Sequence, residues 1–556
     1  MEKRAQGMSL QQRKDNLPEI LRRFEQENMQ KVAVEKYRCH FHLMAPVGWL
    51  NDPNGLSYFR DRYHVFFQYS PFAVNGGMKL WGHYTSKDLV QYKYEGAPFL
   101  PDATYDKDGV FSGSAIVWKD KMYLFYTGNV EEEGDHDYIH SGRGANVIRV
   151  ISEDGEHFSA KQCILTNADY PAECTNQVRD PKLFQMADGT FRMVLGAWLQ
   201  DDKGAVLLYS STDLEHFTFE QLYTTEKAFG YMWECPDIFA LDGHRILAVC
   251  PQGVPSEAEQ YQNIYQSGYF IETEETRTVD ASFKGTKETR TVDASFKGTE
   301  ETRNVNPSFK GTEEIRTVDA SFKGIKETRT VDASFKGTEE IRTVDASFKG
   351  IKETRNVNPS FIEWDMGFDF YAPQTFETPA GRRILIGWAG VPDAEYSSNP
   401  TNEGWQHSLT VPRELRYHNG KIYQLPIREL GQLRKKEILP EKESYVLDNA
   451  CGELIFDGIA GSSSATICVQ IGTGCSLSYE KGLVTLQFTD DSGAGRGKRV
   501  ARCEAVHKIQ ILMDVSILEI YINDGEIVMT SRIFFPEKDA TVRFLGQAEM
   551  IQAWQL

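Results

Sequence analysis

Three acidic residues that lie far apart in the sequence occupy the same position in a repeated local pattern. Asp52, within the stretch Trp-Leu-Asn-Asp-Pro-Asn-Gly, is followed nine residues later by a polar turn and eleven residues later by a strand-like run. Asp180 and Glu234 precede a turn and a strand at the same offsets. Two carboxyl groups on either side of a glycosidic bond can hydrolyse it, because one attacks or activates water while the other protonates the leaving oxygen. The pattern therefore indicates glycosidase chemistry, provided that the fold brings these acids together.

Two further units share the spacing without an acid, and they begin at Phe111 and Ala372. The second strands of the five units are expected to start at residues 63, 122, 191, 245 and 383. Strand-rich units that recur every 40 to 60 residues or so are typical of a β-propeller. Because the first strand of each blade lies nearest the axis, we expect Asp52, Asp180 and Glu234 to converge at one mouth of the central channel.

One interval, of 138 residues, is about twice as long as the others, and a tandem repeat explains it. Between Glu272 and Phe361 a 13-residue unit occurs seven times, and removal of six copies (78 residues) reduces the interval to 60. The insert at 272–361 is therefore expected between blades four and five. Each copy offers two sizeable apolar side chains against an ordering cost of about 1–2 kcal/mol per residue, which favours a mobile or loosely β excursion over a stacked β-structure.

The segments on either side of the repeated units have different patterns. Residues 9–36 carry apolar side chains at helical spacing, which predicts a helix packed on the main body. After Gly431 a charged linker leads to short alternating strands and to the hairpin turn at 523–525, which predicts a second β domain. The expected architecture is all-β, with an N-terminal helical segment at 1–36, a five-bladed β-propeller catalytic domain at 37–431 and a C-terminal β-sandwich at 440–556.

Composition disfavours several classes of partner. The 556-residue chain has a formal net charge of −19, which disfavours nucleic acid and anionic membrane surfaces. Its nine cysteines are scattered without a C-x-x-C spacing, so neither a disulfide framework nor a zinc site is indicated. The first residues lack the apolar stretch of a signal peptide, and no run reaches the roughly 18 apolar residues of a membrane span. We therefore expect a soluble cytoplasmic protein without a cofactor.

Two groups of residues could in principle bind a metal. His40 and His42 would share one face of a strand, but no third ligand lies nearby in the sequence. Acids grouped around an axis could bind Ca²⁺, yet Arg179 beside Asp180 adds positive charge where a cation would sit. No metal is predicted.

Residues near the acids suit the binding of a sugar. Converging carboxylates raise at least one pKa, a cost that is usually tolerated for chemistry, whereas a lone Asp is more often a turn or cap residue. The residues expected to stack on a sugar face are Trp49, Trp81, Phe111, Trp233 and Tyr371. Those expected to bond its hydroxyl groups are Asn51, Gln68, Ser112 and Arg179.

At these residues the chain resembles glycoside hydrolase family 32, the β-fructofuranosidases. Residues 49–55 match the family's nucleophile motif, and 111–114 (Phe-Ser-Gly-Ser) match its substrate-binding turn. Residues 179–181 (Arg-Asp-Pro) match the motif of the transition-state stabiliser, and 234–236 (Glu-Cys-Pro) match the acid/base motif. The resemblance covers roughly residues 35–271 and 362–556, and the 13-residue repeats depart from it.

The resemblance implies a retaining mechanism. Asp52 would attack the anomeric carbon of a β-linked fructosyl unit, Glu234 would protonate the departing oxygen and then activate water, and Asp180 would stabilise the developing positive charge. Retention implies that the carboxyl groups of Asp52 and Glu234 lie about 5–5.5 Å apart. Cys235, beside the acid, would either pack or help to raise the acid's pKa. The substrate would be sucrose, sucrose 6-phosphate or a short fructan, with no phosphate-binding residue assigned.

Two other functions remain in competition. A catalytically inactive carbohydrate-binding propeller would leave sucrose unchanged, and the full set of acids argues against it. A related propeller family cleaves arabinose and xylose linkages with three acids, but the Asn-Asp-Pro-Asn and Glu-Cys-Pro motifs argue for fructose.

Overall fold

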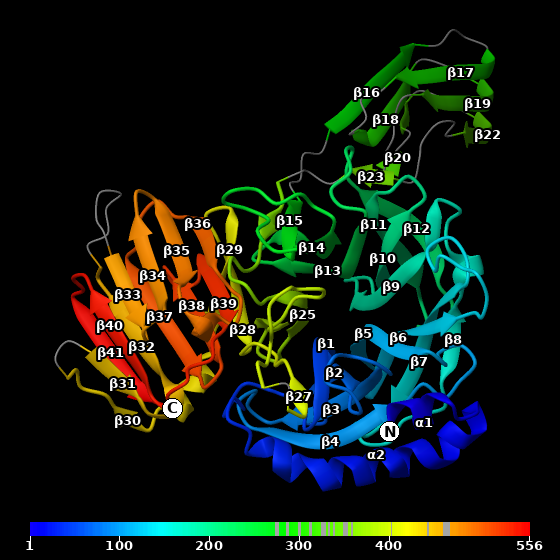
Figure 1. Cartoon of the computed structure of the whole chain (residues 1–556). Helices are drawn as coiled ribbons and strands as arrows, with labels where there is room; N and C mark the ends of the chain where they lie inside the picture. The colour runs from blue at the N-terminus through cyan, green and yellow to red at the C-terminus, as the bar shows by residue number, and fades with distance from the viewer. Residues whose placement is uncertain are drawn as a thin grey trace. The chain divides into compact units, whose positions relative to one another are not determined.

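The structure, a computed structural model, describes residues 1–272, 360–401, 403–441, 444–459 and 467–556, together with the backbone of eight strands between Arg277 and Asn356. The chain divides into two units, whose strands are labelled in Figure 1 where there is room. The first unit comprises residues 1–218, 228–271 and 359–556, and the second comprises 219–227 and 272–358. All the predicted site residues belong to the first unit.

Five antiparallel sheets follow one another along the first unit. Blade one contains β1 (Gly48–Phe59), β2 (Arg62–Ser70), β3 (Leu80–Ser86) and β4 (Tyr92–Phe99), and β27 (Trp405–Gln406) pairs with β1 in parallel. Blade two contains β5 (Gly109–Trp118), β6 (Lys121–Glu131), β7 (Arg143–Ser152) and β8 (Gln162–Leu165). Blade three contains β9 (Cys174–Gln185), β10 (Phe191–Leu199) and β11 (Gly204–Ser211) in this unit. Blade four contains β13 (Met232–Leu241), β14 (His244–Gln252), β15 (Gly268–Glu272) and β24 (Ile362–Glu363), and blade five contains β25 (Tyr371–Glu377), β26 (Arg383–Trp388), β28 (Arg413–His418) and β29 (Lys421–Pro426).

The first strands of the blades close a ring. Strand β1 contacts β5 and β25, β9 contacts β5 and β13, and β13 contacts β25. This is the five-bladed propeller predicted from the repeated spacing, with the first strand of each blade innermost.

Both faces of β2 are buried, because blade one packs against its neighbours on both sides. In β2, Val65 and Phe67 belong to one hydrophobic cluster, while Phe66 belongs to another that also contains Trp81. Alternating side chains therefore enter two different cores. Such strands read as continuous apolar runs, as the stretch Val-Phe-Phe does here.

The C-terminal domain is a sandwich of two six-stranded sheets. One sheet has the order β30 (Lys436–Glu437), β41 (Met550–Gln555), β32 (Cys451–Asp457), β37 (Lys508–Asp514), β38 (Ile517–Ile522) and β39 (Ile527–Arg532). The other has the order β31 (Ser444–Leu447), β40 (Ala540–Leu545), β33 (Ile467–Ile471), β34 (Cys475–Glu480), β35 (Leu483–Phe488) and β36 (Lys498–Arg502). Side chains of both sheets share one core, which confirms the predicted sandwich.

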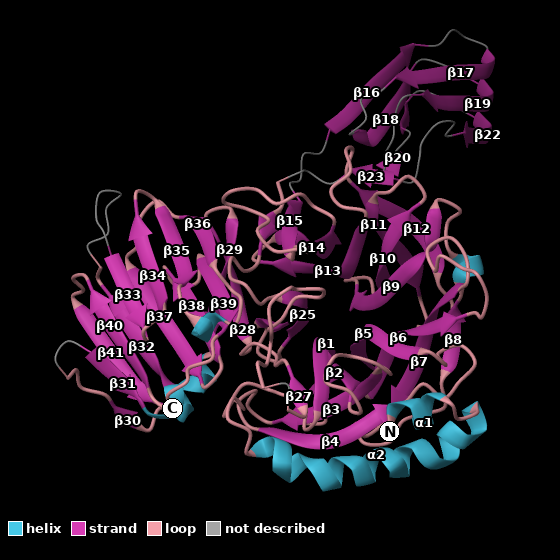
Figure 2. Ribbon diagram, in the orientation of Figure 1, coloured by secondary structure: helices cyan, strands magenta, loops and turns pink. Residues whose placement is uncertain are grey.

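Helices are few, as expected. Helix α1 spans Glu2–Gln6 and α2 spans Leu10–Ala33, close to the predicted 9–36. The Ser9 side chain caps α2 by accepting from the Gln12 N–H, while the Gln12 side chain accepts from the Ser9 N–H. Helix α2 lies alongside β4 (Figure 2), and its buried Glu25 accepts a hydrogen bond from the Tyr94 hydroxyl. Short 3₁₀ helices occupy Asn167–Asp169, Arg428–Leu433, Asp448–Ala450 and Asp491–Gly493.

Within the described ranges, no helix is long and apolar enough to cross a membrane.

All but the first of the described strands of the second unit are built from the tandem repeats. They are β12 (Thr218–Thr224, of which the unit holds residues from 219), β16 (Arg277–Lys284), β17 (Thr289–Lys297), β18 (Thr302–Lys310), β19 (Glu314–Lys323), β20 (Thr330–Val331), β21 (Ser334–Lys336), β22 (Glu340–Ser347) and β23 (Thr354–Asn356). Strand β16 pairs in parallel with β18, and β17 with β19, so that the paired residues from Thr278 onward lie opposite their equivalents two copies along the chain. These strands are arranged as in the stacked alternative; the predicted mobility of the insert stays a prediction, because the residues that connect the strands lie outside the described part.

Candidate active site

A cavity of about 470 Å³ is lined by residues from all five blades. The three predicted acids, Asp52, Asp180 and Glu234, all line it. So do seven of the predicted substrate-binding residues: Trp49, Asn51, Gln68, Phe111, Ser112, Arg179 and Tyr371. The sequence pattern thus located residues that the fold brings into one cavity.

Trp81 and Trp233 are the exceptions and correct the predicted set. The Trp81 side chain is fully buried between blades one and two, and its indole N–H donates to the carbonyl oxygen of Phe111 at 2.9 Å. It supports the residue that lines the cavity and does not line the cavity itself. Trp233 is also fully buried, with its indole N–H bonded to the Phe229 carbonyl oxygen.

A β-bulge interrupts the innermost strand of every blade at the motif. The residues that the bulges leave out of the pairing are 51–52, 111–112, 180–181, 235–236 and 372–373. Bulges redirect side chains and bend the strand. Asp180 and Cys235 accordingly have left-handed backbones, with φ of 63° and 46°. The bulges turn the acids away from the regular alternation of a strand and toward the cavity.

Asp52 accepts hydrogen bonds from three neutral side chains, one of them the Cys235 thiol, whose Sγ lies 3.9 Å from Oδ2. The Asn51 side-chain amide donates to Oδ1 at 2.9 Å, and the Ser112 hydroxyl donates to Oδ2. Burial raises the pKa of Asp52, these two hydrogen bonds oppose that rise, and the charge of Glu234 adds to it. Asp52 is therefore an oriented carboxylate that makes no ion pair among the described residues.

Asp180 has the most altered environment of the three acids. Burial raises its pKa to about 7, and the negative charge of Glu234 contributes to that rise, while Arg179 and the Cys235 N–H oppose it. The Cys235 N–H donates to Oδ2 at 2.9 Å. The carboxyl groups of Asp180 and Glu234 are therefore close enough for the charge of Glu234 to raise the pKa of Asp180.

Glu234 is the most heavily bonded acid. Arg179 donates to Oε1 at 2.9 Å through Nε and lies 2.8 Å from the same oxygen through Nη2. The Tyr371 hydroxyl donates to Oε2 at 2.7 Å, and the Gln252 amide donates to it at 2.8 Å. These four contacts fix the carboxyl group from two sides, and Gln252 was not among the residues predicted from the sequence.

Comparisons with known proteins address the family directly. The family model described as the glycosyl hydrolases family 32 N-terminal domain matches residues 42–301 and 310–426, and the family 32 C-terminal model matches 478–554. The chain belongs to glycoside hydrolase family 32. The predicted resemblance is confirmed, and the three acids of its motifs lie together in the cavity of this glycoside hydrolase.

Relatives and solved structures of this family 32 glycoside hydrolase match nearly its whole length. It is 33% identical to the sucrose-6-phosphate hydrolase of Bacillus subtilis strain 168, over 97% of this chain and 98% of that one. It is 31% identical to the sucrose-6-phosphate hydrolase of Staphylococcus xylosus, over 92% and 90%. A Bombyx mori GH32 β-fructofuranosidase shares the fold with a TM-score of 0.73 at 24% identity, covering 98% of each chain.

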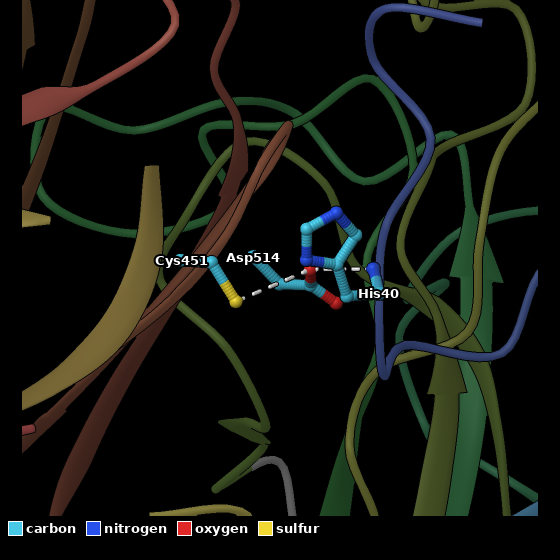
Figure 3. Close-up of side chains that lie close together, drawn as sticks. All are labelled: His40, Cys451 and Asp514. Carbon is cyan, nitrogen blue, oxygen red and sulfur yellow. Dashed lines mark hydrogen bonds between the residues drawn. The ribbon is translucent and has the colours of Figure 1, made fainter. Parts of the chain in front are cut away.

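The side chains of His40 and His42, considered above as a possible metal pair, have different sets of neighbours in this family 32 protein. His42 is buried, and its ring bonds Asp514 and Glu519 through its two nitrogens. His40 instead lies near Cys451 and Asp514 (Figure 3), with ligand atoms within 4.8 Å of one another. The Asp514 oxygens already accept the backbone N–H groups of residues 40, 41 and 42. Asp514, in the sandwich, therefore binds the backbone of residues 40–42 through these hydrogen bonds.

Replacement of Asp180 by Asn should stabilise the protein in a pH-dependent way. Because the folded-state pKa is raised to about 7, the stability associated with the protonated group is present at low pH and lost as pH rises through 7. Asn mimics the protonated state and tolerates the left-handed backbone. We expect a Tm gain of about 2–5 °C at pH 8 that disappears near pH 4.

Asp202→Asn is the matched control for this measurement. Asp202 is exposed, lies in the same blade and also has a left-handed backbone, with φ of 59°. Scanning calorimetry at pH 4, 6 and 8 should show no pH-dependent difference for this variant. A loss of stability at pH 8 in Asp180→Asn would show that the carboxylate is not under electrostatic stress.

Proposed function

We propose that this enzyme is a retaining β-fructofuranosidase that releases fructose from sucrose or sucrose 6-phosphate through a covalent fructosyl–Asp52 intermediate. The observation that carries the proposal is the convergence of Asp52, Asp180 and Glu234, from three blades, on one cavity. The volume of about 470 Å³ lies within the range of about 300–1,000 Å³ that small-molecule sites occupy. The named activities of the relatives support the same substrate class.

Asp52 is the proposed nucleophile. One of its oxygens forms a bond to the anomeric carbon of the fructosyl unit as the bond from that carbon to the leaving oxygen breaks. The hydrogen bonds from Asn51 and Ser112 orient the carboxylate, and the charge of Lys79 lowers its pKa without an ion pair between the two among the described residues. That environment favours attack over ion pairing.

Glu234 is the proposed acid and base. It gives its proton to the leaving oxygen, then takes a proton from the water that attacks the fructosyl–Asp52 ester. Its contacts with Arg179 and Tyr371 stabilise the carboxylate formed after the first proton transfer. Asp180, which lines the same cavity, would form hydrogen bonds with fructosyl hydroxyl groups and stabilise the oxocarbenium-like state.

A rate comparison tests the proposal. Fructose release from sucrose, sucrose 6-phosphate and inulin should be fastest with one of the two disaccharides. A protein that leaves all three unchanged would be a binding module, and release of arabinose or xylose from their glycosides instead would favour the related propeller family.

The cellular location follows from the same substrate proposal. A phosphorylated sugar is charged and does not cross a membrane unaided, so an enzyme that uses it acts in the cytoplasm. We propose a cytoplasmic enzyme whose partner is the sugar itself, without nucleic acid or membrane and without a cofactor.

Deletion of residues 277–354, which contain six repeats, should leave turnover within about 3-fold of the full chain. Strands β15 and β24 are antiparallel neighbours, with Gly268 opposite Glu363, so the insert interrupts a hairpin. The deletion leaves eleven residues to connect them, and closing a loop of this length costs little. Steady-state kinetics with sucrose checks the result, with deletion of a single 13-residue copy as control. Loss of soluble, active protein would show that the repeats are required by the propeller.

A further inference from the structure

Arg143 lines the cavity but has few firm partners. It is the first residue of β7, and its side chain is 17% exposed. Its contacts to Gln177 Oε1 and Glu131 Oε1 are long, at 3.4 and 3.3 Å. Its Nε is buried and has no hydrogen-bond partner among the residues that the structure describes. A guanidinium has five N–H donors, so Arg143 holds unused donor capacity at the cavity wall.

The charge of the second arginine of the cavity, Arg179, is neutralised by a partly buried carboxylate, whereas that of Arg143 is not. Arg179 forms an ion pair with Glu234 at 2.8 Å, whereas the carboxylate nearest Arg143, that of Glu131, is 47% exposed and screened by solvent. Both arginines donate to the same oxygen, Oε1 of Gln177. Burial, and after it the charge of Arg179, lower the pKa of Arg143, because both disfavour a positive charge at this place. An anion bound at Arg143 would relieve that stress.

Hydrogen bonds connect Arg143 to the acid side of the site. Glu234 is bonded by Arg179, Arg179 donates to Gln177, and Gln177 accepts from Arg143. The leaving group departs from the side of the acid that protonates it, so Arg143 lies where the leaving-group sugar would bind. Arginine is suited to phosphate because its planar fork can donate two parallel hydrogen bonds to phosphate oxygens.

Lys79, the other cation of the cavity, belongs to the nucleophile side. Its Nζ donates to Asn51 Oδ1 at 3.1 Å and lies 5.2 Å from the centre of the Trp49 ring. Burial lowers its pKa to about 8, against the attraction of Asp52. Lys79 therefore acts on the residues around Asp52, away from Arg143.

We propose that Arg143 binds a phosphate group on the leaving-group sugar and so sets a preference for sucrose 6-phosphate over sucrose. The inference rests on the proposed function and names the residue that distinguishes the two substrates. The phosphate would displace the weak contact with Glu131 and occupy the unused donors of the guanidinium.

The test is the ratio of kcat/KM for sucrose 6-phosphate to that for sucrose. Arg143→Gln should lower this ratio by about 10- to 100-fold, because a charge-assisted bidentate contact is lost, and Arg143→Lys should lower it less. Lys79→Gln is the control, since it should weaken both substrates alike and keep the ratio within about 3-fold. A wild-type ratio near one, or a ratio unchanged in Arg143→Gln, would overturn the inference.

Product inhibition gives a second readout that does not depend on turnover of the phosphorylated substrate. Glucose 6-phosphate should inhibit sucrose hydrolysis by the wild type at least about 10-fold more strongly than glucose, and Arg143→Gln should remove the difference. Equal inhibition of the wild type by both sugars would contradict the role of Arg143. If the wild type released fructose from neither sucrose nor its phosphate, the proposed function itself would fail.

Discussion

Replacement of Asp52 by Asn is expected to lower kcat for sucrose by about 10⁴-fold or more, with the fold intact. The amide is a poor nucleophile, and removal of a covalent nucleophile has effects of about this size in well-studied hydrolases. The substitution preserves shape, and an amide can still bond the Asn51 and Ser112 side chains. Burial raises the pKa of the carboxyl group, so its replacement by a neutral group should not destabilise the protein.

Asp120→Asn controls for the chemical change itself. Asp120 is exposed in the turn after the inner strand of blade two, with a left-handed backbone that Asn tolerates. Its kcat should equal that of the wild type, and both variants should keep the wild-type Tm. Substantial sucrose hydrolysis by a folded Asp52→Asn enzyme would contradict the assignment of the nucleophile.

Replacement of Glu234 by Gln should lower kcat for sucrose by about 10²- to 10⁴-fold, because general acid catalysis is lost. The effect should be much smaller for an aryl β-fructofuranoside, whose leaving group needs little protonation. A larger loss of kcat on sucrose than on the aryl substrate distinguishes loss of the general acid from a distorted active site, which would slow both reactions alike. It is measured by steady-state kinetics with both substrates.

A stability cost accompanies this variant and needs its own control. Arg179 loses its ion pair with Glu234, and a buried cation without its partner is costly. Glu173→Gln, an exposed position in blade three, should change neither Tm nor kcat. Equal losses on sucrose and on the aryl substrate would indicate that Glu234 acts on binding or folding, and not as an acid.

The sequence predicted the architecture because the blades repeat. Equal offsets of turns and strands revealed five hairpins, and the arithmetic of the 13-residue copies placed the insert between blades four and five. In the structure the insert instead lies within blade four, between β15 and β24, because the two-residue strand β24 after the repeats completes the blade-four sheet and is too short to be recognised from the sequence. The same regularity located Asp52, Asp180 and Glu234 in the inner strands. Local spacing suffices here, since a propeller converts a repeated sequence position into a common place around the axis.

Equal offsets did not give equal backbone positions. Asp52 is the second residue left unpaired by its bulge, Asp180 is the first, and Glu234 comes just before the bulge of its strand. Bulges add residues that counting along a strand does not reveal. The acids nonetheless share the cavity, because each bulge redirects its own strand.

Side-chain direction and distant contacts limited the rest of the prediction. Trp81 was expected to bind sugar, but it lies on the face of β3 that packs between blades, in the cluster that contains Phe66 and Tyr126. Arg143 lines the cavity and Gln252 donates to Glu234, both from strands without a motif. Neither spacing nor composition distinguishes such residues from ordinary strand residues, since their role depends on which neighbouring blade they face.

The central claim, that Asp52 and Glu234 act from opposite sides of one fructosyl unit with double displacement, is tested most directly by the stereochemistry of methanolysis. Methanol competes with water for the fructosyl–enzyme intermediate and yields a methyl fructofuranoside that does not mutarotate. NMR of the product formed from sucrose should show the β anomer, which retains the configuration of the substrate. The α anomer would require direct displacement at the anomeric carbon and would contradict a covalent intermediate on Asp52.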